Sequence, residues 1–396
     1  MTLTAQEQDF ARQHIDDDLA KLALIAHRYP DVSVQALLPR IAALRKLRAK
    51  VPSWFRFDLA VPPVVSVEQA SSEQTAHFKA SRCTGHRMLD LTGGLGVDAF
   101  FWAKSFDEVV YVERDPDLAK TARHNFALLG ANNIRVEKAE AERFLCECAE
   151  TFDLIYVDPA RRDEHQRRVF RLEDCSPNVL ALRDLLLEKA PRVWIKAAPL
   201  LDISLALEQL QSVERVLVVS VVGEVKEVLL QLGRTAKPAE EVPIEAVLLS
   251  SCGTQTFLFT QAEERNSTPI YAAPKGYLYE PDAALLKAGA FKTFAMRFEL
   301  AKLHPHAHLY TSEQHLPDVP GRCFAVEAVL KYDRKTVHQH LAELKANVVV
   351  RHFPDTAEKV RQRLGLSEGG NKYLFGTTTP DGQKLLVLCR PTLTLV

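Results

Sequence analysis

The chain has 396 residues, of which 47% are hydrophobic and 26% are charged, and its formal net charge at pH 7 is −1. This composition predicts a folded globular protein of about two to four domains, and it excludes a chain that binds polyanions through overall positive charge. No apolar run approaches the ~20 residues that cross a bilayer, so we expect no membrane partner. The scattered cysteines and the lack of a secretory signal favour a cytoplasmic location.

Residues 1–65 are expected to form a helical N-terminal region. Segments rich in alanine, leucine and arginine at Asp16–His27 and Val34–Lys50 carry apolar residues at helical spacing. Prolines at 52, 62 and 63 mark a linker after them. We expect this region to contribute packing rather than chemistry.

Residues 66–262 alternate between strand-like and helix-like segments. A helix is expected to begin near Ser71 and Ser72 and to carry Thr75 and Lys79, which face either a ligand or solvent. Strands are predicted at Arg87–Leu91, Glu108–Glu113, Ile134–Val136, Leu154–Val157, Val193–Lys196, Val216–Val222, Val228–Leu232, Ala246–Ser250 and Thr256–Thr260. The alternation predicts an α/β fold with a parallel, Rossmann-like sheet, and the last strands, which no helix separates, predict an antiparallel edge.

Two small α+β domains are expected in the remainder, at residues 263–330 and 331–396. The first begins with a strand at Tyr277, followed by a helix that starts after Pro281 and ends at Gly289. The second is predicted to contain helices at Lys335–Lys345 and Thr356–Leu364 and strands at Asn347–His352, Tyr373–Thr377 and Lys384–Arg390.

The stretch from Met88 to Ala103 is predicted to be a strand, a tight turn and a helix. Its turn holds Gly93, Gly94 and Gly96, and glycine lets a ligand lie against bare main chain. The strand ends in Asp90, before Thr92, and Asp98 follows the turn. A dinucleotide site favours a pyrophosphate at the helix start, whereas an acid at this place suits an amino-bearing ligand. The stretch resembles the S-adenosylmethionine (SAM) site of class I methyltransferases.

Candidate ligand residues also follow the next three strands. Because the carboxyl ends of parallel strands meet at one edge of a sheet, we expect these residues to lie together. Glu113, followed by Arg114, is placed to accept from ribose hydroxyls, and Ala139 and Glu140 are placed to flank adenine. Asp158 ends the fourth strand and is assigned to both the cofactor and the acceptor.

The fourth strand is followed by Asp158-Pro159-Ala160-Arg161. It resembles the Asp/Asn-Pro-Pro-aromatic motif of amino-methyltransferases that act on nucleobases. This resemblance implies that Asp158 and the Pro159 carbonyl accept hydrogen bonds from an exocyclic amine and aim its lone pair at the methyl group, so that positioning supplies the catalysis. No aromatic residue follows Pro159, so base stacking falls to the guanidinium of Arg161 or Arg162 or to another part of the chain.

The fifth strand argues against covalent catalysis, because Lys196-Ala197-Ala198-Pro199 stands where methyltransferases that alkylate uridine C5 need a nucleophilic cysteine. Lys196, Pro199 and Asp202 either line the acceptor pocket or form the turn before the next helix. An arginine-rich loop after the fourth strand either contacts phosphates or is a solvated surface; its arginines are Arg161, Arg162, Arg167, Arg168 and Arg171.

No metal site is expected. His304, His306 and His308 are spaced two apart, but Pro305 interrupts them and no acidic or cysteine partner is evident. Cys146 and Cys148 have no second pair at zinc-ligand spacing.

Together the glycine turn, the Asp158 motif, Tyr279-Glu280-Pro281-Asp282 and Glu368–Phe375 resemble bacterial class I SAM-dependent methyltransferases with a THUMP-like C-terminal domain. The resemblance covers nearly the whole chain after residue 60. It implies a ferredoxin-like domain at 263–330 and a THUMP-like domain at 331–396 after the catalytic sheet. Because THUMP domains bind RNA in tRNA-modifying enzymes, it also implies an RNA substrate.

We therefore expect a SAM-dependent methyltransferase that methylates a base nitrogen of tRNA or rRNA by direct in-line transfer. The absent aromatic residue motivates a different hypothesis, a SAM- or RNA-binding scaffold that has lost its chemistry. A third is an NAD-dependent oxidoreductase. The sequence leaves open a protein or small-molecule acceptor and the oligomeric state.

Overall fold

The computed structural model describes residues 3–61, 64–161 and 171–392. The chain divides into two compact units, Met1–Glu214 with Leu229–Ala236, and Arg215–Val228 with Lys237–Val396.

The N-terminal region is helical, as expected. Its helices are α1 (Ala5–Gln13), α2 (Leu19–Leu24), α3 (Val34–Lys50), α4 (Val64–Gln69) and α5 (Glu73–Ser81). Helix α3 has the predicted bounds, whereas α2 is shorter than predicted, because Asp18 caps its start and a 3₁₀ turn at Ala26–Arg28 follows it. Phe10, Leu22 and Ile41 pack in the small core of this region.

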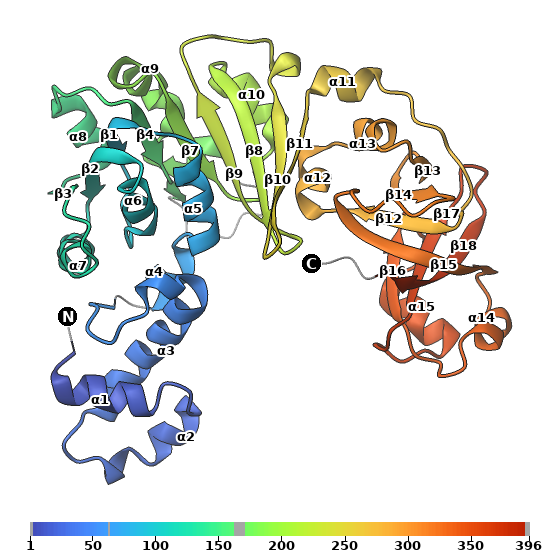
Figure 1. Ribbon diagram of the computed structural model, residues 1–396, viewed down its shortest axis with the longest axis horizontal. Helices are drawn as coiled ribbons and strands as arrows, with labels where there is room; N and C mark the ends of the chain where they lie inside the picture. Colours follow the sequence, from blue (N-terminus) through green and yellow to red (C-terminus); the bar gives the residue numbers. More distant parts are fainter. Residues whose placement is uncertain (1–2, 62–63, 162–170, 393–396) are drawn as a thin grey trace. The chain divides into compact units, whose positions relative to one another are not determined.

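Nine strands form the large sheet in the order β11-β10-β8-β9-β7-β4-β1-β2-β3 (Figure 1). They are β1 (Gly85–Asp90), β2 (Phe106–Glu113), β3 (Ile134–Lys138), β4 (Leu154–Val157), β7 (Val193–Ala197), β8 (Val213–Val221), β9 (Glu224–Leu232), β10 (Ile244–Ser250) and β11 (Gly253–Phe259). Strands β3, β2, β1, β4 and β7 pair in parallel with their neighbours in this series. This parallel core confirms the predicted α/β, Rossmann-like fold.

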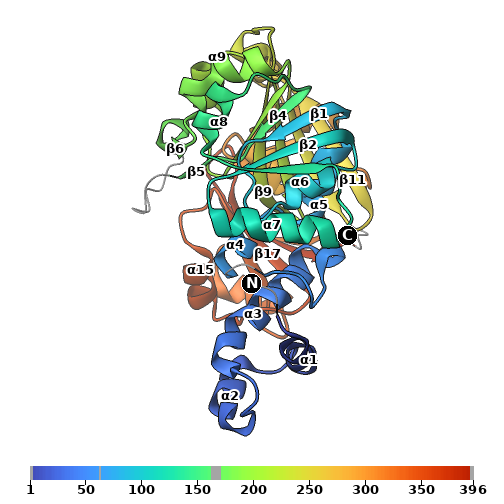
Figure 2. The same ribbon diagram turned by 90° about the vertical axis from the view of Figure 1, so that its left-hand side faces the viewer.

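Helices cover both faces of the parallel strands, which explains their continuous apolar runs such as Leu154–Val157. Figure 2 shows α5, α6 and α7 on one side of these strands and α8 and α9 on the other. The connecting helices are α6 (Val97–Trp102), α7 (Pro116–Leu128), α8 (Ala141–Glu147), α9 (Val179–Lys189) and α10 (Ile203–Leu210).

Strands β8 and β9 follow each other through a tight turn at Val222-Gly223, where both residues have positive φ angles of 49° and 76°. Such angles suit a two-residue hairpin turn. Strand β10 pairs in parallel with β8, and β11 pairs antiparallel with β10, which gives the antiparallel edge that the sequence predicts.

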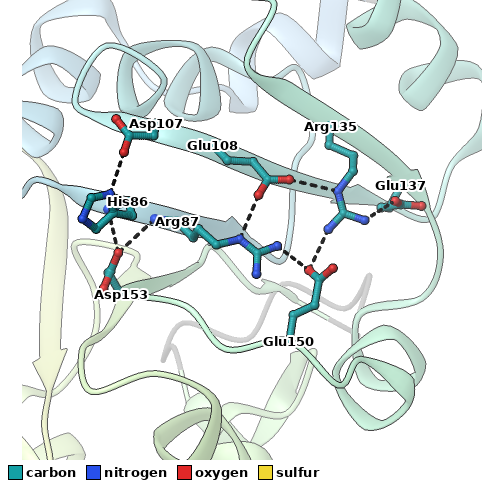
Figure 3. Close-up of polar contacts among 8 residues, drawn as sticks. All are labelled: His86, Arg87, Asp107, Glu108, Arg135, Glu137, Glu150 and Asp153. Carbon is teal, nitrogen blue, oxygen red and sulfur yellow. Dashed lines mark hydrogen bonds and ion pairs between the residues drawn. The ribbon is translucent and has the colours of Figure 1, made fainter.

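A ring of charges joins the first three strands at their amino ends, away from the glycine turn (Figure 3). Arg87 contacts Glu108 at 2.8 Å and Glu150 at 2.7 Å, and Arg135 contacts the same two carboxylates at 3.3 and 2.7 Å. All four side chains are about one-third exposed. Such a network stabilises the pairing of neighbouring strands more than one exposed ion pair does.

The second unit contains a seven-stranded sheet in the order β13-β14-β12-β15-β18-β17-β16. Its strands are β12 (Tyr277–Pro281), β13 (Ala301–His304), β14 (Ala307–Ser312), β15 (Gly321–Lys331), β16 (Asn347–Arg351), β17 (Tyr373–Thr378) and β18 (Lys384–Pro391). The sequence predicts only short strands and helices up to about residue 330, so the length of strand β15 was not predicted. This strand pairs with β12 on one side and β18 on the other, so one sheet continues through residues 277–391.

The helices of this unit are α11 (Gln261–Asn266), α12 (Ala283–Ala288), α13 (Lys292–Arg297), α14 (Arg334–His340) and α15 (Ala357–Leu364). Gly289 caps α12 in the left-handed conformation, as predicted. Helix α14 ends earlier than predicted, at His340. Among the described residues, no helix is both long and apolar enough to cross a membrane.

Candidate active site

The glycine turn lies between β1 and α6, and two of its glycines are required by packing. A Cβ atom on Gly93 would lie 2.2 Å from the Tyr111 ring, and one on Gly96 would lie 2.6 Å from Phe126. Gly94 differs, because a Cβ atom there would meet no atom closer than 3.9 Å. The main chain at Gly94 is therefore open to a ligand, as the sequence predicts for this turn.

Glu113 comes from the end of β2 and contacts this turn directly. The amide of Gly94 donates to Oε2 of Glu113 at 2.8 Å, and the amide of Asp115 donates to Oε1 at 2.8 Å. A carboxylate oxygen has two lone pairs, so both oxygens can still accept from a ligand hydroxyl. The side chain is partly exposed.

Asp90 lies at the tip of β1 and is 1% exposed. The amide of Thr92 donates to its Oδ1 at 3.2 Å. Burial, then repulsion from Asp98, raises the pKa of Asp90 well above its ordinary value. A cationic ligand group would relieve both effects.

Asp158 is tied to the glycine turn from the end of β4. Its amide donates to Oγ1 of Thr92 at 2.6 Å. Its carboxylate accepts from Nζ of Lys196, on β7, at 2.6 Å, while 35% of the side chain remains exposed. Pro159 behind it is buried. The structure thus brings together Asp90, Thr92, Glu113 and Asp158 at one edge of the sheet.

Asp98 is placed differently from these acids. It is buried on α6, where its carboxylate pairs with Lys79 of α5 at 3.0 Å and accepts from Ser71 at 2.7 Å and from Tyr156 at 2.9 Å. Burial would raise the pKa of Asp98, but the charges of Lys79 and Lys196 outweigh it and lower that pKa. These partners favour a role in holding the site together.

The C-terminal sequence matches two family models, a ferredoxin-like domain at residues 277–320 and a THUMP domain-like region at residues 321–391. An uncharacterised S-adenosylmethionine-dependent methyltransferase of Mycobacterium tuberculosis H37Rv is 28% identical over 340 residues, covering 83% of this chain and 88% of that protein. Ribosomal RNA small subunit methyltransferase J of Coxiella burnetii is 30% identical over 132 residues, 29% of this chain and 51% of that protein.

A crystal structure from Porphyromonas gingivalis W83, described as that of a candidate methyltransferase, matches the whole chain. The identity is 33%, the TM-score is 0.87, and the match covers 99% of this chain and 100% of that one. The chain belongs to the class I SAM-dependent methyltransferases with a THUMP-like C-terminal domain. Both the family and the fold predicted from the sequence are confirmed.

The residues of this methyltransferase fit SAM by the chemistry of their donors and acceptors. SAM carries an ammonium group, ribose hydroxyls and an adenine amine, all of which donate hydrogen bonds. The methyltransferase offers the carboxylates of Asp90 and Glu113 beside the open main chain at Gly94. Ala139 lies next to Glu113, because its amide donates to the Glu113 carbonyl at 3.2 Å.

Other predicted residues of the methyltransferase are less closely tied to the turn. Thr75 is buried and its hydroxyl donates to the Ser72 carbonyl at 3.1 Å, within its own helix. Arg114 and Glu140 are exposed. Asp202 caps α10 by accepting from Leu205 at 3.1 Å, which is the turn role that the sequence left open for it.

The arginine-rich loop is described only in part. Arg161 lies on the short strand β5 (Ala160–Arg161), which pairs with β6 (Cys175–Ser176), and Arg171 is exposed. Arg162, Arg167 and Arg168 lie outside the described residues.

The three histidines at positions 304, 306 and 308 do not form a metal site with one another. His306 lies in the turn between β13 and β14, so the three do not share one strand face; His308 stacks on Phe291 at 3.8 Å and His304 stacks on His352 at 4.1 Å. The part of the chain that the structure describes contains no group of three histidine, cysteine or acidic residues suited to a metal.

The sequence did not predict two members of the polar cluster around Asp98. They are Ser71, which hydrogen-bonds to Asp98 and Lys79, and Tyr156, which hydrogen-bonds to Asp98. The only signal for Tyr156 was a phenol within a strand of aliphatic residues, since a buried hydroxyl needs a partner. Ser71 gave no such signal, because a serine before a helix predicts a cap.

Proposed function

We propose that this methyltransferase transfers a methyl group from SAM to a base nitrogen of RNA, in tRNA or rRNA, directly and without a covalent enzyme intermediate. The main observation behind this proposal is the hydrogen bond from the Asp158 amide to the Thr92 hydroxyl. It holds the acceptor motif against the turn where Gly94 is open, and the exposed part of the Asp158 carboxylate can accept from an incoming amine.

In this proposal Asp90 binds the ammonium group of SAM and Glu113 the ribose hydroxyls, while Thr92, Gly93, Gly94 and Gly96 form the surface beneath it. Ala139 and Glu140 flank the adenine. Bound SAM supplies a methyl group that is already activated by the sulfonium. Asp158 and the Pro159 carbonyl orient the acceptor amine, and orientation is the catalytic contribution required of the chain. The acceptor nitrogen bonds the methyl carbon as the carbon–sulfur bond breaks, S-adenosylhomocysteine leaves, and the nitrogen loses its proton to water.

An RNA acceptor is supported by the THUMP-like region and by the partial similarity to an rRNA methyltransferase. Arg161 and the neighbouring arginines are placed in sequence to contact the acceptor or its phosphates. An RNA substrate also favours the cytoplasm as the place of the reaction.

A direct mechanism is supported by the residues at the acceptor side. Strand β7 ends in Lys196 and Ala197, with no cysteine. Cys175 opposes Arg161 across β5 and β6, but its thiol is 0% exposed and donates to the Arg171 carbonyl at 3.4 Å. A buried thiol with this partner is a poor nucleophile.

Replacing Asp158 tests the proposal. We expect Asp158→Ala to lower the rate of tritium transfer from labelled SAM into RNA by about 10²–10³-fold, the loss typical of removing one group that binds the reacting centre. Calorimetry should show that SAM binding persists. Asp184→Ala, at an exposed position on α9, is the matched control and should keep full activity.

The same assay separates this function from the scaffold hypothesis. A scaffold that binds SAM or RNA transfers no label, even as the wild-type protein. Full transfer by Asp158→Ala would remove Asp158 from the mechanism.

A further inference from the structure

Lys196 points from the end of β7 into a cluster of buried polar groups. Its ammonium donates to Oδ2 of Asp158 at 2.6 Å and to Oγ of Ser71 at 3.3 Å, and its side chain is 13% exposed. The Asp158 side chain is 35% exposed. The cation is therefore the more buried partner, and the acid faces outward.

Ser71 connects this ion pair to a second one. Its hydroxyl donates to Asp98 at 2.7 Å and accepts from Lys79 at 3.0 Å, while Lys79 also pairs with Asp98 at 3.0 Å. Lys79 is 0% exposed and Ser71 is 6% exposed. The position of Ser71 is thus set by a buried pair, and Ser71 in turn helps to orient Lys196.

A purely structural role does not account for the outer pair. Lys79 and Asp98 already pair with each other, and Lys196 adds a second positive charge that also lowers the pKa of Asp98. The Asp158 side chain is 35% exposed, so water can solvate its carboxylate and the acid does not need Lys196 to compensate a buried charge. What Lys196 adds is a fixed direction for the Asp158 carboxylate, because a charge-assisted hydrogen bond holds one oxygen and leaves the other available to accept from an amine.

We propose that Lys196 is a positioning residue for methyl transfer: Ser71 and the buried Lys79–Asp98 pair hold its ammonium, and the ammonium holds Asp158 in the orientation that receives the acceptor. The proposal rests on the acceptor role proposed above for Asp158. Lys196 does not touch SAM in this account, and it takes no proton from the acceptor.

Kinetics of Lys196→Met and Lys196→Arg test the proposal. We expect Lys196→Met to lower kcat for RNA methylation about 10–100-fold, with the SAM dissociation constant close to wild type. Lys196→Arg should recover most of kcat, because it restores a cation that donates to Asp158. Lys189→Met is the matched control: Lys189 is also half-buried and donates to the Cys148 carbonyl at 2.8 Å, and its loss should leave kcat unchanged. An unchanged kcat in Lys196→Met would overturn the proposal.

A structural readout keeps the test independent of the RNA assay. Crystal structures of the wild-type protein and Lys196→Met, both with SAM, should show one Asp158 conformer in the first and several in the second. The same Asp158 conformer in both would overturn the role of Lys196, whatever the activity. If the wild-type protein methylates no RNA, the proposed function fails, but the conformers still decide whether Lys196 positions Asp158. Should Lys196→Met not fold, Lys196→Gln and Ser71→Ala give the same comparison.

Discussion

Asp90 is a buried carboxyl group, and its burial raises its pKa. The pKa of Asp90 is higher in the folded protein than in the unfolded chain. Asp90 therefore lowers the stability of the fold at pH values above its ordinary pKa, and this loss of stability is relieved as the pH falls through the raised pKa. The other carboxylates at this edge of the sheet add to the repulsion. A binding site for a cationic group is a place where such a penalty can be recovered.

SAM binding is therefore expected to release a proton from Asp90. The ammonium of SAM favours the carboxylate, so the affinity should rise with pH through the raised pKa of Asp90. Isothermal calorimetry in two buffers of different ionisation enthalpy measures the release. Asp90→Asn should abolish it and weaken binding by about tenfold, the loss of one charged hydrogen bond. Equal proton release by the wild-type protein and Asp90→Asn would contradict the assignment.

Helices α5 and α6 are joined by the buried pair of Lys79 and Asp98. A buried ion pair adds little net stability over an apolar pair, but removing one partner leaves a charge without compensation. Although burial opposes it, the charges of Lys79 and Lys196 lower the pKa of Asp98 in the folded protein. Ionised Asp98 therefore stabilises the fold at pH values above its ordinary pKa, and this stabilisation is lost as the pH falls through the lowered pKa.

We expect Lys79→Met to lower the free energy of unfolding by about 3–5 kcal/mol at neutral pH. The variant should regain part of this stability in acid, where Asp98 becomes protonated. The double variant Lys79→Met/Asp98→Asn should be more stable than Lys79→Met. Urea unfolding measures all three, and Lys120→Met, at an exposed position on α7, should change the free energy by less than about 0.5 kcal/mol. Additive losses in the double variant would show that the two side chains do not depend on each other.

The same elements show how far the sequence predicts the fold and the site. Alternating apolar segments predict the parallel sheet, and the acids at strand ends predict which side chains share its edge, because both follow from local pattern and chain direction. The contact of Ser71 with Lys196 spans 125 positions and depends on side-chain rotamers, which no pattern encodes. Strand β15 was missed because its mixture of exposed and buried residues lacks a clean alternation.

The chain's second unit is held in part by Glu280 on β12. Its side chain is 5% exposed and pairs with Arg322 on β15 and Arg351 on β16, so one carboxylate connects the ferredoxin-like and THUMP-like sequences. The glycine turn belongs to the first unit. Changes at Glu280 should therefore act on the stability of the second unit and leave the glycine turn unchanged.

Glu280→Ala is expected to destabilise only the second unit. Loss of hydrogen bonds between charged groups costs about 1.5–3 kcal/mol, so one of two calorimetric unfolding transitions should shift to lower temperature while the other stays in place. Glu368→Ala removes an exposed partner of Arg361 and should shift neither transition. A shift of both transitions in Glu280→Ala would mean that the units unfold as one.

The central claim is that the acceptor of this methyltransferase is a base nitrogen in RNA. The most direct test uses RNA from cells that lack the protein. This RNA is incubated with the purified protein and with SAM labelled in its methyl group, and its nucleosides are then analysed by mass spectrometry. The account predicts a labelled nucleoside methylated on a base nitrogen, which Asp158→Ala does not produce. Label on ribose or on a base carbon, or no labelled nucleoside in any RNA, would contradict it.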